Sequence, residues 1–436
     1  MCGADAWNTW RKSYPVRGGM LTGYQNCADF SHHCFEEDIG LDRVDFGNGA
    51  IFHCSIFKRW FAFRACEFGH KSDFSYSKFL HSAYFNDSAF GETVSFSCSE
   101  FHAEVVFGCC WFDRSLDFTN VSATHLVSFN GACIGSVARF DRSSFGLATF
   151  IGAMFDLSVH FEYCTFKMAH FDGVRWAQLS ESLYQDMATW RQRCVSIGME
   201  PDRLGRISFR GAKFGGAKFT QRVFEGEVSF DDVIFQKAPD FRDAKISQQT
   251  SFAGAGFPVA PAAPDEAENA AQSYRTLKLA FTQQQAVREE QLFFRLEMRE
   301  EAVTAEGLRK WLIKAYEWTS GFGFEIARPL LRLGLLPSAV LSVVYLVLMA
   351  SHDPVLWTGP IWKVAPSKGI QWAQFTLTNL MPIPGIDLAK ELRPQLFGSS
   401  TFVAFVALVL EMVQKALAVA AFFLTALALR NLFKMK

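Results

Sequence analysis

Polar and ionisable side chains interrupt one of the most apolar stretches of this 436-residue sequence. The stretch runs from Phe402 to Leu429 and contains Glu411, Gln414 and Lys415. Glu411 and Lys415 are four residues apart, so on a helix they share a face and can form an ion pair. Ionisable groups in such a helix usually face a bundle interior or water, where they could line or gate a path for ions. The alternative is that this long helix overshoots a bilayer and its first turns are interfacial; the sequence favours neither.

A second set of candidate residues lies in a short apolar segment ahead of that stretch. The segment reads GIQWAQFTLTNLM over residues 369–381 and is followed by PIPGID. It is too short to cross a bilayer, but segments of this length can be re-entrant or interfacial. A re-entrant helix and its turn would present polar groups to ions. These pore-loop candidates are Thr376, Thr378, Asn379, Pro382, Pro384, Gly385 and Asp387.

The spacing of cysteine and histidine does not indicate metal or redox chemistry. All 11 Cys lie within the first 194 residues, and none forms a C-x-x-C pair, which argues against a zinc site or a disulfide framework. The densest group is Cys27, His32, His33 and Cys34, where we favour ordinary packing over a metal site. P-loop, GxSxG and HExxH motifs are missing from the sequence. We therefore predict no enzyme, no catalytic residue, no cofactor and no bound metal.

Phenylalanine organises the part of the chain before residue 258. The sequence has 46 Phe, and from Phe46 onward they recur in alternating steps of six and five residues. These steps fit neither one face of a helix nor one straight strand, so the chain must turn a corner between successive Phe. Each unit would be a short strand and a turn, with the ring pointing inward. The predicted core includes Phe52, Phe57, Phe63, Phe68, Phe74, Phe79, Phe85, Phe90, Phe96, Phe101, Phe214 and Phe219.

Small side chains two residues before many of these Phe support the same arrangement. Ser55, Cys66, Ser77, Cys110 and Ser143 are examples. Residues two apart on a strand share a face, so large and small side chains would alternate inside a narrow, close-packed tube. This pattern also gives the buried Cys a packing role.

The spacing and the segments SFRGAKFGGAKF and SFAGAGF resemble those of pentapeptide-repeat proteins. The resemblance covers about residues 28–176 and 205–258. It implies a β-solenoid, specifically a right-handed quadrilateral β-helix with four short faces and about 22 residues in each coil. Residues 177–208 break the repeat, and their apolar periodicity predicts a helical insert.

The sequence thus divides into four parts. Residues 1–27 form an N-terminal segment without the apolar run of a secretory signal, and residues 28–258 form the β-helix with its insert. Residues 259–326 comprise the linker PVAPAAP and cytosolic helices, and residues 327–436 form a two-span α-helical membrane domain with a pore-type loop. Its spans lie at about 333–350 and 402–429, with the re-entrant-type helix at about 369–381.

Basic residues near the spans predict their orientation. Arg309, Lys310 and Arg328 are among those that precede the first span, and Arg430 and Lys434 follow the second, whereas the intervening loop is mixed in charge. By the positive-inside rule, both termini would be cytoplasmic. The repeat domain would then lie in the cytosol, and this location agrees with the expectation that its cysteines are free thiols.

The chain from about Ser273 to its end resembles bacterial pentapeptide-repeat proteins that carry a C-terminal ion-channel-like domain. Segments such as TSGFGFEIARPLLRL and FTLTNLMPIPGID carry this similarity. It implies the inner (plasma) membrane, a homo-oligomer and a pore. Potassium-selective members of the wider class have a Gly-Tyr-Gly filter whose carbonyls replace ion hydration. Here Pro382 and Pro384 fix the backbone, so potassium selectivity is not expected.

The leading hypothesis from the sequence is a channel-like pore with a cytosolic β-helix that senses a signal or docks a protein partner. The alternative is a non-conducting, membrane-anchored scaffold for protein interactions, because solenoids present extended surfaces to partners. The expected partners are the lipid bilayer, further copies of the chain and an unidentified protein on the β-helix. A formal net charge of −1 provides no basic footprint for nucleic acid, so none is expected.

Overall fold

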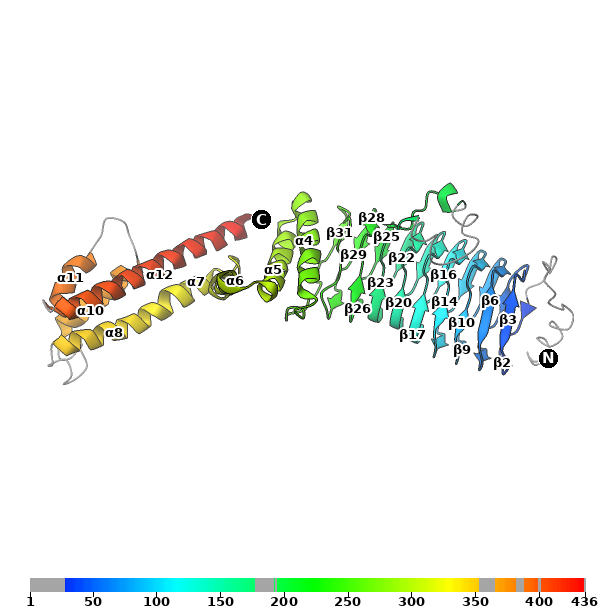
Figure 1. The fold of residues 1–436 in the computed structure, drawn as a ribbon, viewed down its shortest axis with the longest axis horizontal. Helices are drawn as coiled ribbons and strands as arrows, with labels where there is room; N and C mark the ends of the chain where they lie inside the picture. Colours follow the sequence, from blue (N-terminus) through cyan, green and yellow to red (C-terminus); the bar gives the residue numbers. More distant parts are fainter. Residues whose placement is uncertain are drawn as a thin grey trace. The chain divides into compact units, whose positions relative to one another are not determined.

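The computed structural model describes residues 28–176, 192, 194–352, 365–381, 388–398 and 401–434. The chain divides into two units, Met1–Thr304 and Ala305–Lys436. The first unit contains a β-solenoid followed by two helices, and the second unit is helical (Figure 1). The predicted fold class, a β-solenoid followed by an α-helical region with two candidate spans, is confirmed.

The solenoid is built from short parallel strands that pair with their equivalents one coil away. In the first sheet, Ala28 pairs with Ala50, and in another sheet Cys34 pairs with Ile56, so the paired residues are 22 apart, as predicted. In the coils that begin at Ala50, Lys71 and Thr93, four successive strands lie in four different rows before the next strand returns to the first sheet. Four strands per coil agree with the four predicted faces, while the handedness of the coil stays a prediction.

The strands form four sheets. The first contains β1 (Ala28–Asp29), β4 (Ala50–Ile51), β8 (Lys71–Asp73), β12 (Thr93–Ser95), β16 (Ser115–Asp117), β19 (Val137–Arg139), β22 (Ser158–His160), β25 (Arg206–Ser208), β29 (Val228–Ser229) and β31 (Thr250–Ser251). The second contains β2 (Cys34–Phe35), β5 (Ile56–Phe57), β9 (Lys78–Phe79), β13 (Glu100–Phe101), β17 (Ser122–Ser128), β14 (Val105–Val106), β10 (Ala83–Tyr84), β6 (Phe61–Arg64), β3 (Ile39–Asp42), β20 (Ser144–Thr149), β23 (Thr165–His170), β26 (Lys213–Phe214), β27 (Ala217–Lys218) and β30 (Ile234–Phe235). The third contains β7 (Glu67–Phe68), β11 (Ala89–Phe90), β15 (Trp111–Phe112), β18 (Cys133–Ile134) and β21 (Met154–Phe155), and the fourth β24 (Arg203–Leu204) and β28 (Val223–Phe224).

The alternation of five and six residues has a backbone cause. Within the five-residue steps, the second residue after the Phe has a positive φ, as at Cys54 (54°), Tyr76 (58°) and Cys98 (57°). A left-handed residue turns the chain tightly, at a conformational cost for any L-residue other than Gly. The six-residue step between Phe57 and Phe63 contains no such residue. The extra residue there turns the corner without left-handed backbone.

The predicted core phenylalanines lie inside the solenoid. All twelve are at most 2 % exposed and belong to one continuous cluster. Their rings stack on equivalents one coil away, as in Phe52 on Phe74 (centroids 4.9 Å apart) and Phe57 on Phe79 (4.6 Å). Offset stacking adds to the burial of aromatic area, so the ladder is a continuous source of stability along the solenoid.

The small residues two positions before the Phe do more than fill space. Ser77 Oγ donates to the carbonyl of Phe52 at 2.7 Å, and Cys110 Sγ donates to that of Phe85 at 2.8 Å. Cys164 Sγ bonds the carbonyl of Phe140 in the same way, at 2.9 Å. These lumen cysteines have the predicted packing role, and each thiol adds a second hydrogen bond to a buried carbonyl that already accepts one from a backbone amide.

The solenoid resumes earlier than expected after its interruption. β24 and β25 lie between Arg203 and Ser208, inside the range 177–208 predicted as a helical insert, which corrects the end of that insert. Ser158 of β22 pairs with Arg206 of β25, 48 residues later, so the stack continues across the insertion. Residues 177–191 and 193 are outside the described part of the chain.

Two helices pack on the last coil and belong to the solenoid unit. They are α4 (Ala267–Gln283) and α5 (Val287–Thr304). Phe293 on α5 is fully buried and contacts Phe252 of the last coil, with ring centroids 5.4 Å apart. Residues 259–326 therefore do not form a part of their own, because α4 and α5 complete the core of the first unit.

Among its described residues, the second unit contains two helices that are long and apolar enough to cross a membrane, Ala327–Ser351 and Phe402–Phe433. The first includes a π-helical turn, η1, directly after Pro329. The short helix predicted at 369–381 is present as α10. The helices are α6 (Gly307–Ser320), α7 (Ala327–Pro329), η1 (Leu330–Leu335), α8 (Leu336–His352), α10 (Pro366–Leu380), α11 (Leu388–Phe397) and α12 (Thr401–Lys434).

Candidate polar site of the helical unit

Helix α10 is held against both long helices by hydrogen bonds. Trp372 Nε1 donates to the carbonyl of Ser342 on α8 at 2.9 Å. Gln414 Nε2, from α12, donates to the carbonyl of Thr376 at 3.2 Å. The short helix is therefore fixed to α8 and α12, which belong to the two candidate spans.

Each of these three helices carries a buried polar atom without a hydrogen-bond partner in the part of the chain that the structure describes. Asn379 is fully buried, and within the described residues neither its Oδ1 nor its Nδ2 has a hydrogen-bond partner. Gln414 Oε1 and the hydroxyl of Tyr345 likewise have no hydrogen-bond partner within the described residues. A buried polar group left unpaired costs about 1–3 kcal/mol. Groups that persist at this cost mark a place where water, an ion or a second chain is expected.

Glu411 forms ion pairs with two basic side chains. Lys415 Nζ lies 2.8 Å from Glu411 Oε1, so the expected pair is present. Arg393 on α11 adds a second contact, with Nη2 at 2.7 Å from Oε2. Glu411 is 3 % exposed in its side chain, and two cations compensate its charge within one chain. The sequence placed Arg393 in a loop of mixed charge, so this partner was not foreseen.

The other predicted residues divide into two groups. Thr376 and Thr378 donate their hydroxyls to carbonyls of their own helix, at 3.0 Å to Trp372 and 2.7 Å to Gln374. Of the pore-loop candidates, the structure brings Thr376 into contact with α12 and buries Asn379, while the Thr378 hydroxyl is bonded within α10. The remaining candidates lie outside the described residues: Pro382, Pro384, Gly385 and Asp387.

Helix α11 is an element that the sequence reasoning missed. Its buried residues are Ala389, Leu392, Leu396 and Phe397. Their spacing of three, four and one is the apolar stripe of an amphipathic helix, and this signal was available in the sequence. Through Arg393, α11 connects the segment between the spans to Glu411 on α12.

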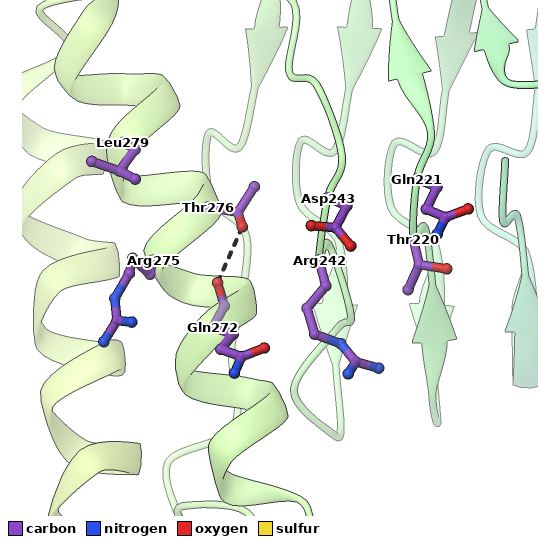
Figure 2. Close-up of a pocket in the computed structure, with 8 residues that line it drawn as sticks. All are labelled: Thr220, Gln221, Arg242, Asp243, Gln272, Arg275, Thr276 and Leu279. Carbon is purple, nitrogen blue, oxygen red and sulfur yellow. Dashed lines mark hydrogen bonds between the residues drawn. The ribbon is translucent and has the colours of Figure 1, made fainter.

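A groove in the first unit is the other candidate site (Figure 2). It lies where α4 meets the solenoid and encloses about 470 Å³. Arg242 is already paired with Asp240 at 2.8 Å, and Arg275 with Glu297 at 2.7 Å. Carboxylates thus neutralise both guanidinium groups of the groove, and its lining residues do not indicate which class of ligand would bind there. The lining residues are Thr220, Gln221, Arg242, Asp243, Gln272, Arg275, Thr276 and Leu279.

The histidine-rich group at the start of the solenoid does not assemble a metal site among the residues that the structure describes. His32 packs against His53, with ring centroids 5.8 Å apart, and His33 against Phe35 at 4.3 Å. Throughout the described ranges, no three His, Cys, Asp or Glu side chains are grouped to hold a metal ion. Cys27 lies outside those ranges.

Comparison of the chain with protein-family models, with curated proteins and with solved structures gave no match. The assignment therefore rests on the repeats and the elements themselves. They show a phenylalanine-rich β-solenoid joined to a helical unit with two candidate membrane-spanning helices.

Proposed function

We propose that this chain is a bacterial inner-membrane protein in which copies of the helical unit assemble into a channel-like pore that is not potassium-selective. The solenoid, in the cytosol, would sense a signal or dock a protein partner. The observation that supports the proposal is that α10 is hydrogen-bonded to both α8 and α12 and carries the buried, unsatisfied amide of Asn379.

The outer faces of the long helices support an assembly in lipid. Val340 and Val343 on α8 are at least 60 % exposed, and so are Phe405 and Phe423 on α12. Apolar side chains exposed in this number suit lipid or a neighbouring copy. Two long helices are too few to enclose a water-filled path, so a pore would need several copies around one axis.

Ion flux from liposomes tests the pore. The full chain, reconstituted into vesicles loaded with a fluorescent ion reporter, is expected to release monovalent ions without preference for potassium. Asn379→Leu removes the polar group that the proposal assigns to the path and is expected to reduce this flux strongly. Thr378→Val is the matched control on the same helix, because its hydroxyl is bonded within α10. Lack of flux from the unmodified protein in any lipid or salt would overturn the proposal.

A non-conducting anchor is the second candidate, and the ion pairs of Glu411 favour it. Arg393 and Lys415 compensate this carboxylate inside a single chain, as expected for a packed helical bundle without a polar path. In that case the unmodified protein gives no flux. A fragment of residues 1–304 includes the whole core of the first unit. It would still bind the partner of the full chain but would no longer bind the membrane.

A further inference from the structure

Three sulfur atoms from distant parts of the sequence meet on the solenoid. Cys133 Sγ lies 3.3 Å from Cys194 Sγ and 3.1 Å from Met199 Sδ. Cys133 belongs to β18, whereas Cys194 and Met199 belong to the segment through which the chain returns to the solenoid after its insertion. The contact therefore joins two parts of the fold that are more than 60 residues apart.

The sulfur atoms are shielded from water by a small apolar cluster of their own. Cys133 is 1 % exposed, Cys194 is fully buried and Met199 is 7 % exposed. Trp111 and Met154 complete the cluster, which is separate from the phenylalanine core. Met154 brings a second thioether into the same group of side chains.

The position of Cys133 in its repeat unit distinguishes it from the cysteines of the lumen. Cys110 and Cys164 stand two residues before a core Phe and donate to backbone carbonyls inside the tube. Cys133 stands one residue before Ile134, which occupies the core position, so alternation along the strand turns Cys133 to the outside. Its thiol contacts two sulfur atoms there.

We propose that Cys133, Cys194 and Met199 form a binding site for one Cu(I) ion. Thiolate and thioether sulfurs are soft ligands that select Cu(I). Zinc sites use Cys, His and carboxylate ligands, and a thioether in their place disfavours Zn(II). On binding, Cu(I) forms a bond to each of two thiolates, and the two thiols release one proton each. The thioether of Met199 supplies a neutral third ligand, and no electron is transferred.

Two consequences follow from this chemistry. Because two protons are released, the apparent affinity for Cu(I) rises with pH while the thiols are protonated. Because the ligands come from both sides of the insertion, the ion binds the folded arrangement and not the unfolded chain, and it raises the stability of the first unit.

The test is an anaerobic titration of the full chain, reduced and in detergent, with Cu(I) buffered by a chromogenic Cu(I) chelator. We expect one Cu(I) per chain, with the near-ultraviolet absorption of Cu(I)–thiolate bonds. Cys194→Ser should lower the affinity for Cu(I) by at least about tenfold. Mutation of a residue that only hydrogen-bonds a metal ligand already costs about tenfold or more in metal affinity, and Cys194 would itself be a ligand. Met199→Leu, which keeps the volume, should weaken binding without removing the thiolate absorption.

Cys164→Ser is the matched control. It changes a buried thiol of the lumen to the residue found at the equivalent Ser143, and it should leave Cu(I) binding unchanged. Equal Cu(I) affinity in Cys194→Ser and Cys164→Ser would overturn the proposal. So would Zn(II) binding in preference to Cu(I), or a reduced protein that takes up no Cu(I) and instead forms a Cys133–Cys194 disulfide in air.

Discussion

At the scale of single residues, Arg222 compensates for the interruption of the solenoid. It stands two positions before Phe224, where other units carry a small side chain, and it is fully buried. Its guanidinium group reaches the carbonyls beside the point at which the chain leaves the solenoid and returns to it. The acceptors, at 2.6–3.2 Å, are the carbonyl oxygens of Phe150, Ala153, Phe171 and Pro201.

The protonation of Arg222 follows from the same surroundings. Burial lowers the pKa of Arg222 to about 9, because removal from water disfavours the charged form. The four carbonyl acceptors favour the charged form, so the side chain stays protonated at neutral pH. A single arginine thereby bonds four backbone carbonyls, one of which, that of Phe150, also accepts a hydrogen bond from the amide of Ala153.

Replacement of this side chain should destabilise the solenoid. Arg222→Met keeps much of the length and removes every donor, and each buried acceptor left unpaired costs about 1–3 kcal/mol. We expect the free energy of unfolding of the first unit to fall by at least about 3 kcal/mol. The measurement is urea unfolding of the full chain in detergent, followed by tryptophan fluorescence. Arg210→Met, at an exposed position, is the control, and an equal fall in both variants would contradict this role.

At the scale of elements, helices α4 and α5 close the end of the phenylalanine ladder. The stack of rings does not end at Phe252, because Phe281 on α4 and Phe293 on α5 lie 5.9 and 5.4 Å from its ring. Terminal units of repeat proteins need such a cover, since they would otherwise expose the core to water. Ser273 of α4 fixes the register by accepting a hydrogen bond from the amide of Phe241 at 2.8 Å.

Removal of one ring from this cover should expose the last coil. Phe293→Ala is expected to cost about 3–5 kcal/mol, the usual loss for a buried phenylalanine. Cleavage after the last coil by a protease at low concentration would then become faster than in the unmodified protein. Leu279→Ala on α4, whose side chain is 53 % exposed, serves as the control. Unchanged cleavage in Phe293→Ala would mean that α5 does not protect the coil.

How far the elements could be predicted depends on how regular their signals are. The phenylalanine steps fixed the coil length and the core, since every coil repeats the same packing. The strand β24 lies just before the predicted second block of repeats, and it was missed because Leu204 fills a core position without a Phe. Arg222 stands at a lumen position where the pattern predicts a small side chain. Only its hydrogen bonds to carbonyls beside the insertion explain this exception. The link from Arg393 to Glu411 depends on tertiary packing of α11, which no local pattern encodes.

The ion pairs of α11 and α12 give a prediction for the helical unit. Arg393→Met leaves Glu411 with Lys415 alone, and breaking a buried ion pair costs about 3–5 kcal/mol. We expect a lower thermal midpoint in detergent, measured by loss of helical circular dichroism. Glu411→Gln removes the carboxylate that both cations contact, so Arg393→Met should cost much less in the Glu411→Gln background than in the unmodified protein. An equal loss in both backgrounds would contradict the network.

At the scale of the whole molecule, the two units divide the chemistry of the chain between them. Every one of the 11 Cys lies in the first 194 residues, and the second unit has none. The second unit instead exposes apolar side chains along two helices of 25 and 32 residues. This division suits a first unit in the reducing cytosol and a second unit in lipid, and it makes the proposed orientation measurable with a single added thiol.

Ser367→Cys provides that thiol. Ser367 is exposed at the start of α10, between the two candidate spans. If both termini are cytoplasmic, a membrane-impermeant maleimide should label Ser367→Cys in intact expressing cells. The unmodified protein should remain unlabelled until the membrane is permeabilised, although it exposes Cys54 and Cys98 in part. Labelling of the unmodified protein in intact cells would place the solenoid outside. Labelling of neither protein before permeabilisation would place the start of α10 on the cytoplasmic side or within the bilayer, and either position rules out the expected orientation of that segment.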